Sequence, residues 1–451
     1  MDVTLDAIRN CLEGVIPAVI ATSAPDGTPN VAYLSQVHFV DNAHVALTFQ
    51  FFNKTRENVL ANPRATVQVI DPDTAVPYRL TLEYLRTETD GPLFEYMKAK
   101  LAGIASHTGM SKVFRLLGAD IYRVLDIDCV PGTIVPYAIP RRSRLAALRA
   151  CAQRLGTCTD LATALDQLLR GLHEQFEIQH AMVLMFDAQN DRLYTVASHG
   201  YEASGVGSEL ALGAGVIGVA ARERTPIRIT HVTGDYAYSR AVREGLSGHG
   251  SGDALETAIP FPGLPAPHSQ LAVPIVLRGR LLGVLYVESD EDLRFTFEDE
   301  DALVTLAAQL ALAVELNEQG GEAHEAGLPN STPRRKVLGS AVTIRHYVVN
   351  DSVFIGEDYL IKGVAGAIFW KLLRDFAGEG RTDFSNRELR LDPSIRLPDI
   401  SDNLEARLIL LQRRLAEHCT FLGIEKTGRG RFRLRVDRPV DLIDIAACND
   451  G

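Results

Sequence analysis

Two basic side chains stand at the start of a predicted helix near the N-terminus. Lys54 and Arg56 lie in the stretch FFNKTREN, residues 51–58. The helix dipole disfavours positive charge at this end of a helix, whereas free N–H groups together with two cations suit an anion such as phosphate. The competing interpretation is that both side chains are solvated, as lysine and arginine usually are. The residues therefore predict either an anion site or two exposed cations.

Three glycines in the middle of the chain have the spacing of a dinucleotide-binding loop. Gly213, Gly215 and Gly218 fit the pattern GxGxxG. That motif needs a preceding strand, a crossover helix and an acidic residue about 20 positions later. Here a short predicted helix over 216–222 runs into Pro226 and a strand. The glycines are therefore predicted to shape a turn, and a dinucleotide is not expected.

The elements that must position Lys54 and Arg56 are short strands. The helix over 55–61 stops at Asn62-Pro63, and Asp26-Gly27 is a strong hairpin signal between two strands. Short strands with one interposed helix favour a small β-barrel. The predicted strands cover residues 15–22, 31–40, 44–51, 64–70 and 78–88.

The DGTPN turn, the next two strands and the strand–NKT–helix–NPRA unit resemble a known family. They are similar to the FMN-binding split barrel of the pyridoxamine-phosphate-oxidase-like family, over roughly residues 8–130. The resemblance implies FMN as the cofactor, with FAD or haem as alternatives, although some relatives bind a deazaflavin or have lost their ligand. It implies that Lys54, Thr55 and Arg56 hold the phosphate. The full set of implied cofactor-binding residues is Ser35, Gln36, Thr48, Gln50, Asn53, Lys54, Thr55 and Arg56.

Two histidines of the first domain raise the question of haem. His38 alternates within a predicted strand, and His107 lies at a helix end flanked by Gly and Ser. A lone histidine has many other roles, so a structural position for His38 is the simpler interpretation. No catalytic residue is predicted in this domain.

The middle of the chain carries several motifs in a fixed order. They are GAGVIG at 213–218, the QLAVP strand at 270–274, LLGVLYVES at 281–289 and a closing helix after FTFED at 295–299. Thr296 suits the N-cap of that helix, and the acids at 298–300 suit its first turn. Together these motifs resemble a GAF domain over roughly residues 161–318. The resemblance implies a six-stranded antiparallel sheet with helices behind it and a sensory or dimerising role, while the ligand stays unknown. Bilin attachment is not expected, because no cysteine lies between Cys158 and Cys419.

The last part of the chain is predicted to contain short strands, three helices and a basic hairpin. The helix over 403–417 and the hairpin ending TGRGRFRL resemble the winged-helix output domain of the OmpR/PhoB type, over about residues 348–436. The resemblance implies that this helix enters the major groove of DNA and that the hairpin contacts phosphate. The candidate contacts are Arg407, Arg413, Arg414, Lys426, Arg429 and Arg431.

One pair of residues departs from that pattern. Ile409 and Leu410 stand where polar or basic residues usually read DNA, and neither can donate a hydrogen bond to a base edge. Either the pair contacts thymine methyl groups, or it is an exposed apolar patch that docks a protein. DNA binding and protein docking therefore both stay open.

Length and composition are those of a multidomain protein. The chain has 451 residues, which suggests about three domains. The net charge of −11 argues against non-specific adhesion of the whole chain to nucleic acid, but allows one locally basic domain. Six cysteines without a CxxC pair suit a reducing cytosol and predict neither a disulfide framework nor a zinc site. No signal peptide or membrane span is expected.

We therefore expect a multidomain α+β protein. The predicted order is a split β-barrel at 1–141, a GAF domain at 142–318, a flexible linker at 319–336 and a winged helix at 337–451. Apolar stripes on the helices over 144–155 and 301–315 predict a homodimer, unless both stripes pack internally.

The sequence favours a cytoplasmic one-component sensor and transcriptional regulator, in which the barrel and the GAF domain control the winged helix. The alternative is a flavin- or haem-dependent oxidoreductase whose other domains serve dimerisation or docking. No adjacent acid, base or nucleophile pair supports that alternative, although flavoenzymes rely on the cofactor for chemistry. A binding scaffold without cofactor is the third possibility.

Overall fold

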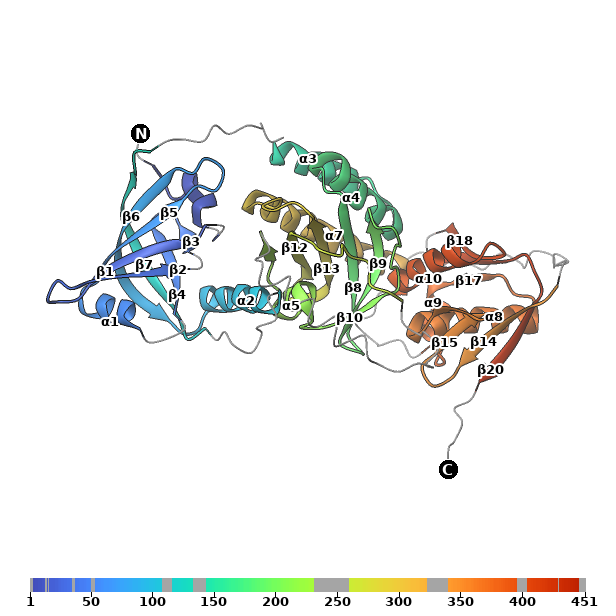
Figure 1. Ribbon diagram of the computed structural model, residues 1–451. Helices are drawn as coiled ribbons and strands as arrows, with labels where there is room; N and C mark the ends of the chain where they lie inside the picture. The colour runs from blue at the N-terminus through green and yellow to red at the C-terminus, as the bar shows by residue number, and fades with distance from the viewer. Residues whose placement is uncertain are drawn as a thin grey trace, which may run out of the picture.

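The computed structural model describes residues 3–12, 14, 16–34, 37–49, 53–107, 116–132, 143–230, 259–322, 340–395, 404–428 and 430–445. Three folded parts follow one another along an elongated molecule, from the blue barrel to the red C-terminal part (Figure 1). In the described ranges, no helix has the length and apolarity needed to cross a membrane.

The first domain is built on a seven-stranded sheet in the order β2-β1-β5-β6-β7-β4-β3, with antiparallel neighbours. Alternate residues of β5, Ala65, Val67 and Val69, are buried in its core. Gly27 has φ +86° at the predicted hairpin turn, where glycine is favoured. The predicted strand over 31–40 is two strands. The elements are η1 Asp6–Leu12, β1 Ala18–Ser23, β2 Pro29–Leu34, β3 Val37–Asp41, β4 His44–Phe49, α1 Lys54–Ala61, β5 Arg64–Ile70, β6 Pro77–Glu88, α2 Pro92–His107 and β7 Gly118–Cys129.

The middle domain contains a six-stranded sheet in the order β10-β9-β8-β13-β12-β11, and all neighbouring strands are antiparallel, as expected. Its two faces bury separate cores, one under α3, α4 and α7 and one under α5. Gly213 and Gly215 have φ of +80° and +59°, which confirms that they shape a turn. The elements are α3 Arg144–Gly156, α4 Leu161–Phe176, β8 His180–Asp187, β9 Arg192–His199, β10 Glu209–Ala211, α5 Gly215–Glu223, β11 Ile227–Ile229, β12 Ser269–Leu277, β13 Arg280–Ser289 and α7 Phe297–Glu322.

Within its described residues, the last domain contains two small sheets, in the orders β16-β15-β14-β20 and β17-β19-β18, around three helices. The predicted strands, helices and hairpin are present. The sequence pattern did not predict β20, which pairs in parallel with β14. The elements are β14 Val342–Tyr347, β15 Ser352–Ile355, β16 Asp358–Ile361, α8 Gly363–Glu379, β17 Asp383–Ser385, α9 Asn386–Leu391, α10 Leu404–His418, β18 Leu422–Gly428, β19 Arg431–Val436 and β20 Val440–Ile445.

A buried histidine ties β20 to the rest of this domain. His346 Nδ1 lies 2.8 Å from Asp444 Oδ1 on β20, and its Nε2 lies 3.1 Å from Asp351 Oδ1. The ring stacks on Trp370 at 4.7 Å. Burial opposes protonation of His346, but the two carboxylates outweigh burial and raise its pKa above the ordinary value. In its protonated form, the His346 ring donates to one carboxylate on each side.

We expect the attachment of β20 to weaken as the pH rises. A raised folded-state pKa contributes stability that is fully present below the unfolded value of about 6.5 and is lost as the pH passes the folded value. Hydrogen exchange of β20 amides, corrected for intrinsic rates, should show less protection in mild alkali than in mild acid. Asp444→Asn should reduce that pH dependence, whereas Asp441→Asn, at an exposed position on the same strand, should keep it. Equal protection at both pH values in the wild type would contradict the assignment.

Candidate functional site

The start of α1 is held against the first hairpin by side-chain hydrogen bonds. Asn53 caps the helix, because its side chain accepts from the Arg56 N–H at 3.1 Å. Thr55 Oγ1 accepts from Asn30 Nδ2 at 2.9 Å. Lys54 Nζ lies 3.2 Å from Glu57 Oε2, and the Lys54 side chain is 51% exposed. A cation, a hydroxyl and the first-turn amides therefore meet at one helix start.

Arg56, the second predicted cation, makes a buried ion pair with the sheet. Its Nη1 lies 2.5 and 2.6 Å from the two carboxylate oxygens of Asp120 on β7. Its Nη2 donates to Thr87 Oγ1 on β6 at 3.1 Å. The side chains of Arg56 and Asp120 are only 15% and 8% exposed. This guanidinium holds α1 on the sheet, which leaves Lys54 as the more accessible cation of the pair.

The remaining predicted cofactor residues are only partly described. Thr48 on β4 is the strand partner of Ala119 on β7, and the next pair along these two strands is Leu47 with Asp120. Thr48 is therefore on the strand next to the Arg56–Asp120 pair. Ser35, Gln36 and Gln50 lie outside the described residues.

Of the two histidines considered for haem, only the side chain of His38 lies within the described residues. His38 is 4% exposed in the interior, and burial, followed by the charge of Lys100, lowers its pKa to about 3. It is therefore neutral and occupies a structural position. The backbone of His107 ends α2, and its side chain lies outside the described part.

A buried charge cluster joins the first domain to the middle domain. Glu300, in the first turn of α7, lies 2.8 Å from Arg228 Nε on β11 and 3.8 Å from Lys100 Nζ on α2. Burial acts to raise the pKa of Glu300, but the two cations outweigh it and hold the pKa below its ordinary value. Next to this cluster, α2 lies so close to β11 that a Cβ atom added to Gly103 would overlap the side chain of Ile227. The two domains are therefore packed in direct contact.

The acids on either side of Glu300 hold further cations. Asp299 lies 2.8 Å from Arg144 Nε on α3, and Asp301 lies 3.7 Å from Arg9 Nη1 on η1. The sequence pattern explains the acids at 298–300 only through the helix dipole. No local signal points to their cations, since each cation comes from a distant segment. We call Asp299, Glu300 and Asp301 the α7 junction.

The predicted DNA-reading helix, α10, lies against α4 and β9 of the middle domain. Arg407 Nη2 is 2.9 Å from Asp187 Oδ2 at the end of β8, and its guanidinium stands 4.1 Å from the centre of the Tyr194 ring. Burial acts to raise the pKa of Asp187, but Arg407 together with hydrogen bonds from Asn190 and Gln189 outweighs burial, so the net pKa is lowered. The Arg407 side chain is 7% exposed. A predicted phosphate or base contact is thus occupied by a carboxylate of the same chain.

The other two arginines of α10 are also engaged. Arg413 Nη2 lies 2.6 Å from Asp166 Oδ1 on α4, and its Nη1 donates to the carbonyl of Val196 on β9 at 3.0 Å. Arg414 Nε donates to the carbonyl of Leu360 within the last domain at 3.0 Å. Two of the three predicted reading arginines therefore bind the middle domain, and the third binds its own domain.

The expectation that Ile409 and Leu410 are exposed is wrong. They are 5% and 3% exposed. The Cδ1 atom of Leu410 lies 3.6 Å from the position that a Cβ atom added to Gly207 would occupy. Leu410 therefore packs against the loop after β9. The pair is buried because the neighbouring domain covers this face of α10, which no pattern within the helix reveals.

The start of the hairpin faces the same domain. Lys426 Nζ lies 3.2 Å from Glu405 Oε1 on α10 and 4.0 Å from Asp160 Oδ2, the N-cap of α4. Arg431 lies on β19 and is partly buried, and Arg429 lies outside the described residues. The structure thus brings Arg407, Arg413 and Lys426 together along one interdomain seam.

Comparison with known families identifies two of the domains. Residues 160–314 match the family model of the GAF domain, and residues 4–124 match the model of pyridoxamine 5'-phosphate oxidase. The middle domain is a GAF domain, and the first is a pyridoxamine-phosphate-oxidase-like domain. The last domain lies outside both matched ranges. None of the curated proteins matches the chain.

Several solved structures resemble single domains of the chain. The GAF domain from an Acinetobacter phosphoenolpyruvate-protein phosphotransferase is 22% identical and covers 41% of this chain and 100% of its own, with a TM-score of 0.32. An FMN-binding protein from Syntrophomonas wolfei subsp. wolfei is 15% identical and covers 30% of this chain and 88% of its own, with a TM-score of 0.24.

The GAF domain is the centre of the arrangement. Its α7 junction receives the oxidase-like domain, and its β9 and α4 receive α10 of the last domain. The GAF domain therefore connects the oxidase-like domain to the helix that carries Arg407 and Arg413.

Proposed function

We propose that this protein is a sensory regulator in which a flavin-binding barrel and the GAF domain control a winged-helix DNA-binding domain. The observation that carries the proposal is the docking of α10 on the GAF domain. Arg407 and Arg413 of α10 suit DNA phosphate. In this arrangement they are paired with the carboxylates of Asp187 and Asp166 in place of phosphate. DNA and the GAF domain then compete for the same side chains.

The arrangement of the last domain supports the winged-helix assignment. The helices α8, α9 and α10 are followed directly by the hairpin β18–β19, and β19 also pairs with the short strand β17 between α8 and α9. In winged helices the helix before the hairpin enters the major groove. That helix is α10 here.

The docked arrangement is the DNA-free state under this proposal. Ile409 and Leu410 are buried against the rest of the chain, and burial of each such side chain contributes about 1.5–3 kcal/mol. Release of α10 therefore needs a ligand or redox signal that favours the open state by a few kcal/mol.

The first domain offers a fitting place for a flavin phosphate. Lys54 is half exposed at the α1 start, the hydroxyl of Thr55 lies beside it, and the amides of the first turn add donors. A bound flavin would supply a group that accepts and donates electrons. Arg56 and Asp120 position the helix that presents these donors.

Lys54→Ala should weaken FMN binding about 10-fold. A hydrogen bond to a charged group contributes about 1.5–3 kcal/mol, and the exposure of Lys54 places it at the lower end. Quenching of flavin fluorescence during a titration measures the affinity. Arg64→Ala removes another exposed cation of the same domain, on β5, and should leave the affinity unchanged. If the wild type takes up no flavin, or if both variants bind FMN with the affinity of the wild type, the assignment of the flavin site to the start of α1 is wrong.

We also propose a homodimer that forms through the outer faces of α3 and α7. The inner stripes pack within the GAF domain, where Cys151 and Leu306 are buried, but Leu145 and Val304 stay 74% and 39% exposed. Light scattering at micromolar concentration should give twice the chain mass, and Leu145→Glu with Val304→Glu should lower it. A wild-type monomer would end this proposal.

The regulatory function is tested by duplex binding of the full chain. The proposal expects salt-sensitive binding that strengthens when α10 is released, as the Asp187 variant below is designed to do. A chain that binds no duplex at low ionic strength, with or without that substitution, is not a DNA-binding regulator.

A further inference from the structure

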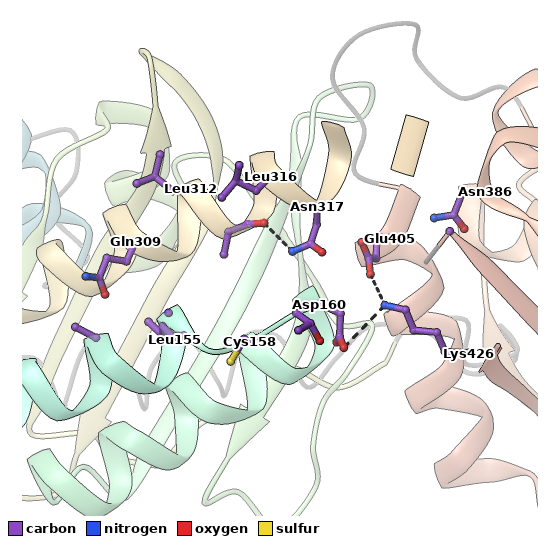
Figure 2. A pocket seen from close by; sticks show the side chains of 15 residues that line it. Leu155, Cys158, Asp160, Gln309, Leu312, Leu316, Asn317, Asn386, Glu405 and Lys426 are labelled. Carbon is purple, nitrogen blue, oxygen red and sulfur yellow. Dashed lines mark hydrogen bonds and ion pairs between the residues drawn. The ribbon is translucent and has the colours of Figure 1, made fainter. Parts of the chain in front are cut away.

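A cavity of about 660 Å³ lies on the seam between the GAF domain and the last domain (Figure 2). Pockets for small molecules usually measure about 300–1,000 Å³ and often lie between domains. A smaller cavity shares four of its lining residues and continues along α10. The seam is therefore large enough to admit a small molecule.

One wall of the cavity is apolar. Leu312 and Leu316 lie along α7, as Figure 2 shows, and are 53% and 64% exposed. Leu155 of α3 adds to this wall. Large apolar side chains that stay this exposed gain free energy when an apolar ligand covers them.

The polar groups of the cavity favour hydrogen-bond donors on the ligand. The Oε1 atom of Gln309 is buried and has no hydrogen-bond partner among the described residues. Across the cavity stand the carboxylates of Asp160 and Glu405, with Lys426 between them at 4.0 and 3.2 Å. The ammonium group is thus already paired with two anions. Arg431 lines only the smaller cavity.

We propose that this seam cavity binds a small amphipathic molecule that has an apolar body, an N–H donor and no negative charge. The apolar body would cover Leu312 and Leu316, and the donor would meet Gln309 Oε1. Because the lining comes from both domains, the occupied cavity holds α10 in its docked position. That consequence rests on the proposed function, whereas the binding itself does not.

Fluorescence titration of the full chain with dansylcadaverine, an apolar ring system with N–H groups and a primary amine, tests the site. We expect saturable binding of one dye per chain. Gln309→Leu should weaken it about 5-fold, as expected for one lost hydrogen bond of about 1 kcal/mol. Leu316→Arg should weaken it further, because it places a cation in the apolar wall. The controls are Ala308→Leu and Ala308→Arg, which introduce the same side chains at the exposed position next to Gln309, outside the cavity lining, and both should bind like the wild type.

Two further readouts locate the site and test its charge preference. Cys158 lines the cavity, so bound dye should slow its reaction with N-ethylmaleimide, while the exposed Cys129 of the first domain reacts at an unchanged rate. The anionic dye 1-anilinonaphthalene-8-sulfonate should bind at least 10-fold more weakly. No saturable binding, equal binding by the Gln309 and Leu316 variants, unprotected Cys158, or equal affinity for the anionic dye would each overturn the proposal. The titration contains no DNA, so its failure is separate from failure of duplex binding.

Discussion

Replacing Asp187 by Asn should increase duplex binding by the full chain about 100-fold or more. Removing one partner of a buried ion pair costs about 3–5 kcal/mol, because the other charge stays buried and unpaired. Here that cost falls on the docked state alone, since Arg407 becomes solvated when α10 leaves the GAF domain. Each 1.4 kcal/mol taken from the docked state corresponds to about a 10-fold gain for DNA. Asparagine keeps an oxygen that can accept from the amides of Gln189 and Asn190.

The measurement is titration of a fluorescent mixed-sequence duplex at about 50 mM salt, where phosphate contacts are strong. Asp166→Asn is the matched control, because its ion pair with Arg413 lies on the same face but Asp166 is 59% exposed. Exposed pairs contribute about 0–1 kcal/mol, so this variant should gain about 5-fold at most. Equal affinity of the wild type and Asp187→Asn would mean that Asp187 does not restrain α10.

Glu300→Gln should destabilise the contact between the first domain and the GAF domain by about 3–5 kcal/mol. The substitution removes the carboxylate charge that both Lys100 and Arg228 face in the buried cluster, and a broken buried ion pair typically costs that much. Hydrogen exchange along α2 and β11 should increase in the full chain, and thermal unfolding should separate into more than one transition.

Glu298→Gln controls for the helix dipole, because Glu298 is exposed in the same turn of α7. Its effect should stay below about 1 kcal/mol. The lowered pKa of Glu300 also fixes the pH dependence: its stabilisation is present above the unfolded value and is lost as the pH falls through the folded value. The contact should therefore be unaffected near neutrality and weaken in acid. If α2 and β11 keep their protection in Glu300→Gln, the junction does not hold the domains together.

Local signals in the sequence were sufficient for most elements. The Asp26-Gly27 turn, the stop at Asn62-Pro63 and the glycines around Gly215 act through the backbone of neighbouring residues, and the structure has the predicted turns there. The six-stranded sheet followed from a resemblance carried by several motifs together. The turns and the helix end depend on short-range chemistry, which a sequence displays directly, whereas the sheet pairs distant strands such as β8 and β13.

The candidate site could be predicted only in part, because its decisive contacts join distant residues. The ion pair of Arg56 joins it to Asp120, 64 positions away, and no local pattern predicts that contact. Arg407 and Leu410 look like one exposed helix face until the GAF domain covers it. The amphipathic pattern of a helix identifies the face that packs on the core of its own domain. α10 has a second buried face, which packs against another domain and which this pattern does not identify.

The most direct test of the account is hydrogen exchange of α10 in the full chain, with and without FMN. Under the proposed function, a cofactor in the first domain acts through the α7 junction and the GAF domain on the docked helix, α10. The proposed function predicts that FMN changes the protection of amides in Leu404–His418 and that Lys54→Ala shifts this change to higher FMN concentrations. FMN binding that leaves the protection of α10 unchanged would contradict it.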